Sequence, residues 1–336
     1  MSLPFVESQR SILQSRNFFL FSFSRLPLVF IVGGWNLSRH DMSVKQFYRW
    51  LDIMEGDKRW FCAHIELRRI TLRGLGLVRY GLDTCEGPAI SRNSAQLLEP
   101  GVYAPYLGNE PFEDSIGADV PPHTFAKFVR DAAAVVKRGH GDFNEESKLS
   151  KSTIAEVRAR DGNVCCITGR RDLPTRVVWL FLPALANTVY PNRDAGKRDI
   201  KKAYNTIDNA VTLCQALVEP FMENKFSVDI DDNKRIVTFA DLTAYPNAPS
   251  LPNELPSLPV GAAQYWRANF KRTLMVHFYG GDIAFEKPEP GLNPDDLFEE
   301  VAEWGYDPKH PKWETPIGKA VLAEYEEQRA SLEGRS

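Results

Sequence analysis

Histidine and cysteine, the side chains that most often act as bases, nucleophiles or metal ligands, are few and scattered in this sequence. Five cysteines stand at positions 62, 85, 165, 166 and 214, without a CxxC pair or a Cys/His spacing typical of a metal site. No histidine occurs between His140 and His277. Free thiols without a disulfide framework favour a reducing compartment, so we expect a cytoplasmic or nuclear protein.

The remaining candidates for chemistry have a structural interpretation. His277 falls in phase with the apolar positions of a helix expected over residues 264–279, so we interpret it as a core histidine with its ring satisfied. Cys166 is interpreted as a buried structural residue, because no neighbouring base is positioned to lower its pKa. The sequence therefore predicts neither a metal site nor a cofactor.

A more informative pattern begins with a short helix. Thr153 is its expected N-cap, with Glu156 as the capping-box partner, and the block Arg160-Asp161-Gly162 ends it at the glycine. Residues 164–168 then predict a strand that leads into a turn at residues 169–172. These elements frame the block Cys166-Ile167-Thr168-Gly169.

The second half of this pattern has one long apolar run. Residues 177–182 are all apolar and predict a strand covered on both faces, which ends before Pro183. After a basic, polar loop, Asn209 introduces a helical stretch near residues 213–222. A hairpin is expected over residues 226–239, with its turn at Asp231-Asp232-Asn233.

This order of blocks resembles the HNH endonuclease domain, in a form found in hypothetical proteins of mushroom-forming fungi. That family reads roughly as R-D-G, C-x-x-T-G, a strand ending in H-I-I-P, a long loop, N-G-I-x-L, L-H-x-x-F-D and a hairpin. The resemblance covers residues 153–239 and continues weakly into YWRANFKRTLMVHFYGGD and WETPIGKAVLAEYEEQRA. It implies an α+β protein built on a ββα-metal (HNH-like) core with helical and β flanking regions.

The sequence departs from this family at the positions that carry its chemistry. Leu180 stands where the family has the general-base histidine, and Val218 stands where it has a metal-binding histidine. Met222 replaces the acidic residue that follows the helix phenylalanine, and only Asn209 remains of the three central motif positions. Leucine and valine can neither accept a proton nor bind a divalent metal. Asn209 is expected to keep a structural role, bonded to the loop before Pro183 or capping the following helix.

Charge is concentrated in one segment. The net charge of the whole chain is −3, but residues 151–202 hold eleven Lys or Arg against five Asp or Glu. Basic surfaces of this kind neutralise phosphates in nucleic-acid complexes. The candidate phosphate-binding residues are Arg170, Arg171, Arg193, Lys197, Arg198, Lys201 and Lys202.

The N-terminal region predicts ordinary globular structure. Residues 17–34 favour a pair of strands over a signal peptide, because Arg25 and Pro27 interrupt the apolar run, which is also too short for a membrane span. A helix is expected from near Ser43, a strand over residues 61–67 and a further helix over residues 121–139.

Five segments follow from these patterns. They are an N-terminal α/β region (1–115), a helix and linker (116–150), the degenerate HNH-like core (151–240), a proline-rich strap (241–262) and an acidic helical region (263–336). Prolines at 246, 249, 252, 256 and 259 exclude a helix from the strap.

Three functions remain open. The first is a pseudoenzyme, an HNH-like module without catalysis that binds nucleic acid or a protein partner through its basic segment. The second is a tailoring enzyme of fungal secondary metabolism that reuses the emptied, apolar pocket for a small molecule, an idea that rests on the resemblance. The third is an active endonuclease with relocated metal ligands.

Overall fold

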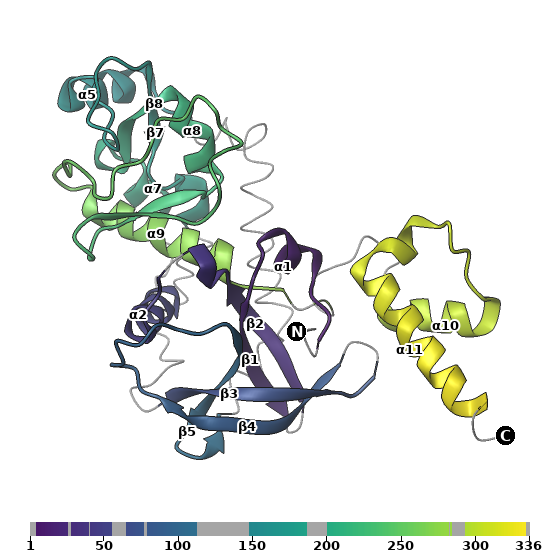
Figure 1. Ribbon diagram of the computed structural model, residues 1–336. Coiled ribbons are helices and arrows are strands. Elements are labelled where there is room, and N and C mark those ends of the chain that lie inside the picture. Colours follow the sequence, from purple (N-terminus) through teal and green to yellow (C-terminus); the bar gives the residue numbers. More distant parts are fainter. Residues whose placement is uncertain are drawn as a thin grey trace. The chain divides into compact units, whose positions relative to one another are not determined.

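The computed structural model describes residues 5–25, 28–39, 41–55, 65–76, 79–112, 148–186, 200–281, 283 and 293–333 (Figure 1). The fold is α+β, as the sequence predicts, and its strands pair antiparallel except for β1 with β5. The chain divides into two compact units, one formed by residues 1–126 and 278–336, the other by residues 127–277. Within the described ranges, no helix is long and apolar enough to cross a membrane.

The first unit is organised around a six-stranded sheet. Its strands are β1 (Phe18–Arg25), β2 (Leu28–Trp35), β3 (Ile65–Gly74), β4 (Tyr80–Ile90), β5 (Gly101–Leu107) and β6 (Glu110–Pro111). They are ordered β1-β2-β4-β3-β5-β6, and β1 also pairs in parallel with β5, so the sheet closes on itself. Its interior is rich in aromatic side chains, among them Phe19, Phe21, Phe23 and Tyr106.

Helices flank this sheet in the sequence. They are α1 (Gln9–Leu13), the short 3-10 helix η1 (Leu37–Arg39), α2 (Val44–Glu55), α10 (Pro294–Trp304), the 3-10 helix η4 (Pro311–Glu314) and α11 (Pro316–Glu333). The predicted strand pair and the helix after Ser43 are confirmed. The strand expected over 61–67 is confirmed only from Ile65 and continues to Gly74, since 61–64 lie outside the described residues. The helix expected over 121–139 also lies outside them.

The second unit contains the segment that resembles the HNH domain. Its elements are α5 (Lys151–Asp161), β7 (Thr175–Trp179), the 3-10 helix η2 (Pro183–Leu185), α7 (Ile200–Tyr204), the 3-10 helix η3 (Ile207–Asn209), β8 (Ala210–Cys214), α8 (Gln215–Met222), β9 (Phe226–Asp229), β10 (Arg235–Thr238) and α9 (Ala263–Phe278). Strands β7 and β8 pair antiparallel, and so do β9 and β10. The last residue of α9, Phe278, belongs to the first unit.

Two local expectations in this unit are wrong, and a third is confirmed with a later start. Ser150, rather than Thr153, is the N-cap of α5, and its hydroxyl accepts a hydrogen bond from the Thr153 N–H. Residues 164–168 form turns instead of a strand, and the Cys166 N–H bonds only the Thr212 carbonyl of β8. The helical stretch expected near residues 213–222 is confirmed as α8, although it begins at Gln215 because the preceding residues form strand β8.

The expected end of α5 and the expected hairpin are confirmed, and the expected strand over residues 177–182 is confirmed in part. Gly162 ends α5 in a left-handed conformation, with φ of 61°, which glycine adopts without steric cost. The hairpin β9–β10 forms as predicted, and Asn233 in its turn has φ of 51°. The strand expected over 177–182 is shorter, because the ladder of β7 ends at Trp179.

The proline-rich strap has no helix, as predicted, and lies along the hairpin. The Ile236 N–H donates to the Asn253 carbonyl at 2.8 Å, and the Leu255 N–H donates to the Lys234 carbonyl at 2.9 Å. Leu255 is buried in the same hydrophobic cluster as the hairpin residues Phe226 and Val228. The strap therefore belongs to the packed core of the second unit.

Candidate functional site

Asn209 is the one central position that agrees with the motif in the resemblance, and the structure places it in a buried network. Its side chain is 0% exposed. The Phe181 N–H donates to Asn209 Oδ1 at 3.0 Å, and Asn209 Nδ2 donates to the carbonyls of Phe181 and Tyr204, each at 2.7 Å. The amide thus holds together the segment after β7 and the end of α7. We call these three hydrogen bonds the Asn209 brace.

The sequence analysis expected Asn209 to bond this loop or to cap the following helix. The first expectation is confirmed by the bonds to Phe181. The second is wrong, because α8 starts six residues later and Cys214 occupies its N-cap position. The role of Asn209 in this fold is to satisfy backbone groups that burial would otherwise leave without partners.

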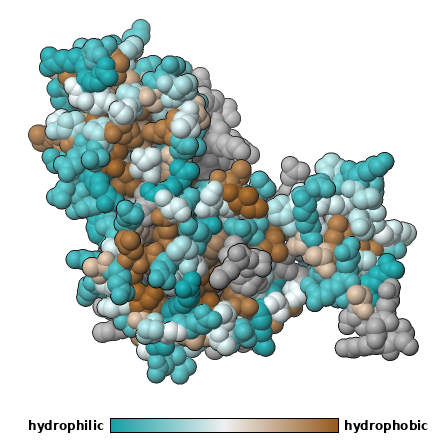
Figure 2. Space-filling view, in the orientation of Figure 1, coloured by the Kyte–Doolittle hydropathy of each residue, from teal (hydrophilic) through white to brown (hydrophobic). Residues whose placement is uncertain are grey.

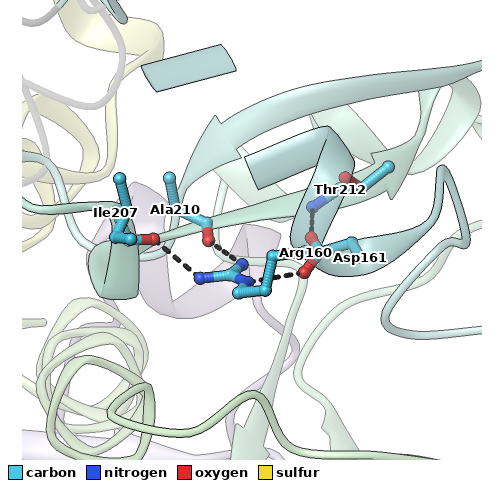
Figure 3. A network of polar contacts seen from close by, with 5 residues as sticks. All are labelled: Arg160, Asp161, Ile207, Ala210 and Thr212. Carbon is cyan, nitrogen blue, oxygen red and sulfur yellow. Dashed lines mark hydrogen bonds and ion pairs between the residues drawn. The ribbon is translucent and has the colours of Figure 1, made fainter. Parts of the chain in front are cut away.

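A second polar network joins the end of α5 to β8 (Figure 3). Arg160 donates to the carbonyls of Ile207 and Ala210 at 2.8 and 2.6 Å, and its Nε lies 2.7 Å from Asp161 Oδ1. The other oxygen of Asp161 accepts the Thr212 N–H at 2.8 Å. This Arg160–Asp161 network fixes the start of β8, one residue after Asn209.

The two positions that the resemblance aligns with HNH histidines lie in one hydrophobic cluster. Leu180, just after β7, is 1% exposed, and Val218 of α8 is 8% exposed. Both belong to a cluster that includes Phe221 and Trp266, and the partly buried Met222 packs against it. The backbone of Leu180 is held on both sides, because its N–H donates to the Asn209 carbonyl at 2.7 Å and its carbonyl accepts from Asn269 at 2.8 Å.

These residues do not fit the divalent metal that the resemblance implies. Leucine, valine and methionine occupy the three replaced positions, and neither hydrocarbon side chain offers a lone pair to a metal. In the described part of the chain, no group of three or more His, Cys, Asp and Glu side chains could hold a metal ion. Leu180 offers no proton acceptor at the position where the resemblance places the general base.

The cysteines near this site are buried. Cys165 is 0% exposed, and its Sγ accepts the N–H of Cys214 at 3.2 Å. Burial raises the pKa of the Cys166 thiol well above its usual range, with smaller contributions from Cys165 and Asp161. A high pKa leaves little thiolate near neutral pH, which is consistent with the structural interpretation of Cys166.

His277 also has the structural role that its helical phase predicts. Its ring stacks on Phe239 with centroids 5.1 Å apart, and Nε2 lies 2.7 Å from the Asn224 carbonyl. This histidine therefore links α9 to the end of α8 and to the segment after β10.

The candidate phosphate-binding residues differ in their surroundings. Arg170 is exposed but pairs with Asp172, which raises the pKa of the arginine and lowers that of the aspartate. Arg171 and Lys202 are exposed. The positions Arg193, Lys197 and Arg198 lie outside the described residues, and Lys201 is described only as part of the backbone of α7.

The structure adds cations that the sequence analysis did not single out. Lys151 and Arg158 are exposed on α5, seven residues apart and so on one face of the helix. The Arg171 guanidinium lies next to the C-cap Gly162, since a Cβ built there would be 3.9 Å from it. Figure 2 shows mostly hydrophilic colours over the region where Figure 1 places α5. The spacing of seven residues between Lys151 and Arg158 on a predicted helix is the sequence signal that could have identified this basic face.

Comparisons with known proteins add no information on the family or the function of this chain. No family model matches the chain, and no curated protein or solved structure matches it either.

Proposed function

We propose that the second unit is a non-catalytic HNH-type module that binds nucleic acid without cleaving it. The observation that carries this proposal is the burial of Leu180 and Val218 in one hydrophobic cluster beside the intact Asn209 brace. The hydrolytic side chains of the family would stand at those two positions. Apolar packing there stabilises the unit and leaves no group that could activate water.

The order of elements supports the HNH-type assignment. Strand β7 pairs antiparallel with β8, a long connection containing α7 joins them, and α8 follows β8 directly. This is the β-β-α order that the resemblance implies for a ββα-metal core. The Asn209 brace and the Arg160–Asp161 network both act on the backbone of this core, which accounts for the retention of their residues in the absence of catalysis.

A small-molecule site at the same positions has less support. Leu180, Val218 and Phe221 belong to one cluster with Trp266 of α9. A ligand placed among them would have to displace this packing, which is costly in a close-packed interior.

The partner is inferred from the exposed cations. Among the residues that the structure describes, no ion pair is found for Arg158, Arg171 or Arg176, whereas Arg170 is paired with Asp172. Unpaired surface cations are available to neutralise phosphates and release counterions. The contacts would be made to the nucleic-acid backbone, so little base specificity is expected.

The test is a titration of the full-length protein with fluorescent duplex DNA, single-stranded DNA and single-stranded RNA. Binding through phosphates makes log K fall linearly with log salt, with a slope of about 0.9 for each phosphate contacted on duplex DNA. We expect R171Q to weaken binding to every sequence and to reduce this slope by roughly 1. R170Q is the matched control, because Arg170 already has a carboxylate partner.

The same preparation tests the loss of catalysis. We expect no cleavage of plasmid or linear DNA with Mg²⁺, Mn²⁺, Ni²⁺ or Zn²⁺. Salt-insensitive binding, or equal effects of R170Q and R171Q, would overturn the nucleic-acid assignment. Metal-dependent nicking that N209A abolishes would instead show that the unit is an active nuclease.

A further inference from the structure

One of the described cysteines differs from the others in its exposure. Cys85 of β4 is exposed, whereas Cys165, Cys166 and Cys214 are buried. Cys62 lies outside the described residues. A thiol reacts with a solute only where the solute can reach the sulfur, so Cys85 is the described cysteine that is open to such chemistry.

Three neighbouring strands of the first unit bring polar side chains to the sheet face that carries Cys85. The strands are ordered β4-β3-β5. Cys85 lies opposite Ile70 of β3, and Arg68 precedes Ile70 by two residues, so these side chains point to one face. On the other side of β3, Arg68 lies opposite Ala104 of β5, and Tyr106 follows Ala104 by two residues. The register therefore places Cys85, Arg68 and Tyr106 on one face of three adjoining strands.

The Arg68 guanidinium is fixed over the Tyr106 ring. Its Cζ lies 5.4 Å from the centroid of that ring. Its Nη2 donates to the Gly108 carbonyl and to Asn109 Oδ1, each at 2.8 Å. A cation held over an aromatic ring is attracted to it, so Arg68 holds the Tyr106 ring on the sheet face that carries the thiol.

The Tyr106 hydroxyl is directed towards Cys85. The side chain is 2% exposed, and its hydroxyl makes no hydrogen bond to nitrogen or oxygen in the described part of the chain. Burial raises the pKa of Tyr106 above its usual range, and a hydrogen bond with the Cys85 side chain raises it further. A hydrogen bond raises the pKa of the hydroxyl that donates it, so Tyr106 is the donor and the sulfur is the acceptor. Because sulfur is a weak acceptor, this buried donor is only partly satisfied.

We propose that Cys85 is a site of reversible oxidation by hydroperoxides, at which the Tyr106 hydroxyl stabilises the sulfenic acid that forms. An oxygen atom on the sulfur accepts a hydrogen bond better than the sulfur itself does. Oxidation therefore gives the buried Tyr106 hydroxyl a partner that the thiol supplies only weakly. The site lies in the first unit and is independent of the function proposed for the second.

The chemistry of this step needs only the thiol and the peroxide. The Cys85 sulfur attacks one peroxide oxygen, an S–O bond forms and the O–O bond breaks. The thiol proton leaves with the second oxygen, as water when the oxidant is hydrogen peroxide. The sulfur is oxidised by two electrons and the peroxide is reduced by the same two. A small thiol such as glutathione reverses the step, since it displaces water to form a mixed disulfide that a second thiol molecule then reduces.

The first experiment treats the reduced full-length protein with hydrogen peroxide in the presence of dimedone, which reacts with sulfenic acids. Mass spectrometry of the digested protein then locates the label. We expect dimedone on Cys85 and little on the buried Cys165, Cys166 and Cys214. Glutathione added after the peroxide and before dimedone should remove the label from Cys85.

Variants then assign the effect to the Tyr106 hydroxyl. Y106F keeps the ring and removes the donor, and we expect the sulfenic acid trapped at Cys85 to fall by roughly tenfold, with more of the irreversible sulfinic acid. Y103F is the matched control, because it also removes a hydroxyl from β5, one that bonds the Glu99 carbonyl instead. T84C/C85A moves the exposed thiol by one residue, to the opposite face of β4, and we expect it to trap less sulfenic acid than the wild type.

The proposal is overturned if peroxide does not convert Cys85 to a form that dimedone traps. It is equally overturned if Y106F and Y103F accumulate the same amount of sulfenic acid at Cys85. Where Y106F does not fold, T84C/C85A decides, because this variant leaves Tyr106 in place. A thiol at position 84 that yields as much sulfenic acid as Cys85 does in the wild type would then show that exposure alone accounts for the reaction.

Discussion

The Asn209 brace and the Leu180/Val218 cluster lie side by side in one unit, yet they differ in chemical character. The brace is polar and buried, and all three of its hydrogen bonds go to backbone groups. The cluster is apolar, and Leu180 is attached to the brace only through its N–H. In the alignment that we propose, Leu180 and Val218 stand where the HNH family has histidines, whereas Asn209 matches that family.

This difference separates two kinds of motif residue. Asn209 satisfies backbone groups of the fold itself, so its loss would leave buried donors and acceptors without partners. A catalytic histidine at position 180 would add a polar ring to an apolar environment, at a cost in stability. Under the proposed function, apolar residues at positions 180 and 218 therefore add stability, whereas a replacement of Asn209 would remove it.

The largest expected effect comes from restoring both histidines. In L180H/V218H, two imidazoles would be buried without partners, each at a cost of roughly 1–3 kcal/mol of unfolding free energy. We expect weak binding of Zn²⁺ or Ni²⁺ and little or no DNA cleavage, because the groups that would orient the new ligands are absent. Denaturant unfolding and calorimetric titration with metal measure the two effects.

The wild type is the control for this double variant. Equal metal binding by both proteins would place the metal site elsewhere. A folded double variant that binds no metal would mean that positions 180 and 218 do not converge, which would remove the main geometric support for an HNH-type core.

The second largest effect concerns the brace. N209A leaves the Phe181 N–H and two carbonyls without partners, so we expect a loss of roughly 2–5 kcal/mol in unfolding free energy. N205A is the matched control, because Asn205 is exposed on the same connection. If N209A and N205A have the same unfolding free energy, the brace contributes nothing to stability. The brace and the cluster would then not differ in the way described above.

The sequence could predict those parts of the site that depend on short-range signals. The Asp231-Asp232-Asn233 turn and the Gly162 stop both lie within a few residues of the structure that they determine. The pairing of β1 with β5 and the contact of Asn269 with Leu180 join positions far apart in the chain. No local periodicity specifies such contacts, because they are set by packing.

Residues 164–168 show a different reason for failure. Their apolar, β-branched composition favours a strand, but their N–H groups bond four different groups: the Asp161 and Arg170 carbonyls, the Thr212 carbonyl of β8 and the Cys165 sulfur. No single strand serves as their partner. Propensity scales for strands do not contain these interactions, so tertiary contacts override the local preference.

A smaller effect is expected from the Cys166 thiol at alkaline pH. Burial raises the pKa of Cys166 above its unfolded value of 9.0, so the folded state keeps a proton that the unfolded state loses as pH rises past 9. Stability should therefore fall by about 1 kcal/mol between pH 9 and 10 through this group. In C166A the fall over that interval should be smaller by this amount, while C85A, which changes an exposed thiol, should follow the wild type. Equal slopes in C166A and C85A would contradict the assignment.

The smallest effect tests the start of α5, whose other end carries the Arg160–Asp161 network. The sequence favoured Thr153 as the N-cap, because its hydroxyl is followed by Glu156 at capping-box spacing. In the structure the Ser150 hydroxyl accepts the Thr153 N–H at 3.0 Å, so S150A should lose about 1 kcal/mol and T153A clearly less. Denaturant unfolding of both variants decides between the two caps. A greater loss in T153A would mean that α5 begins three residues later, with one turn less between its cap and the Arg160–Asp161 network.

Because that network bonds β8 directly, a shift of the cap should not alter the effect of N209A, and a double variant S150A/N209A should lose the sum of the two single losses.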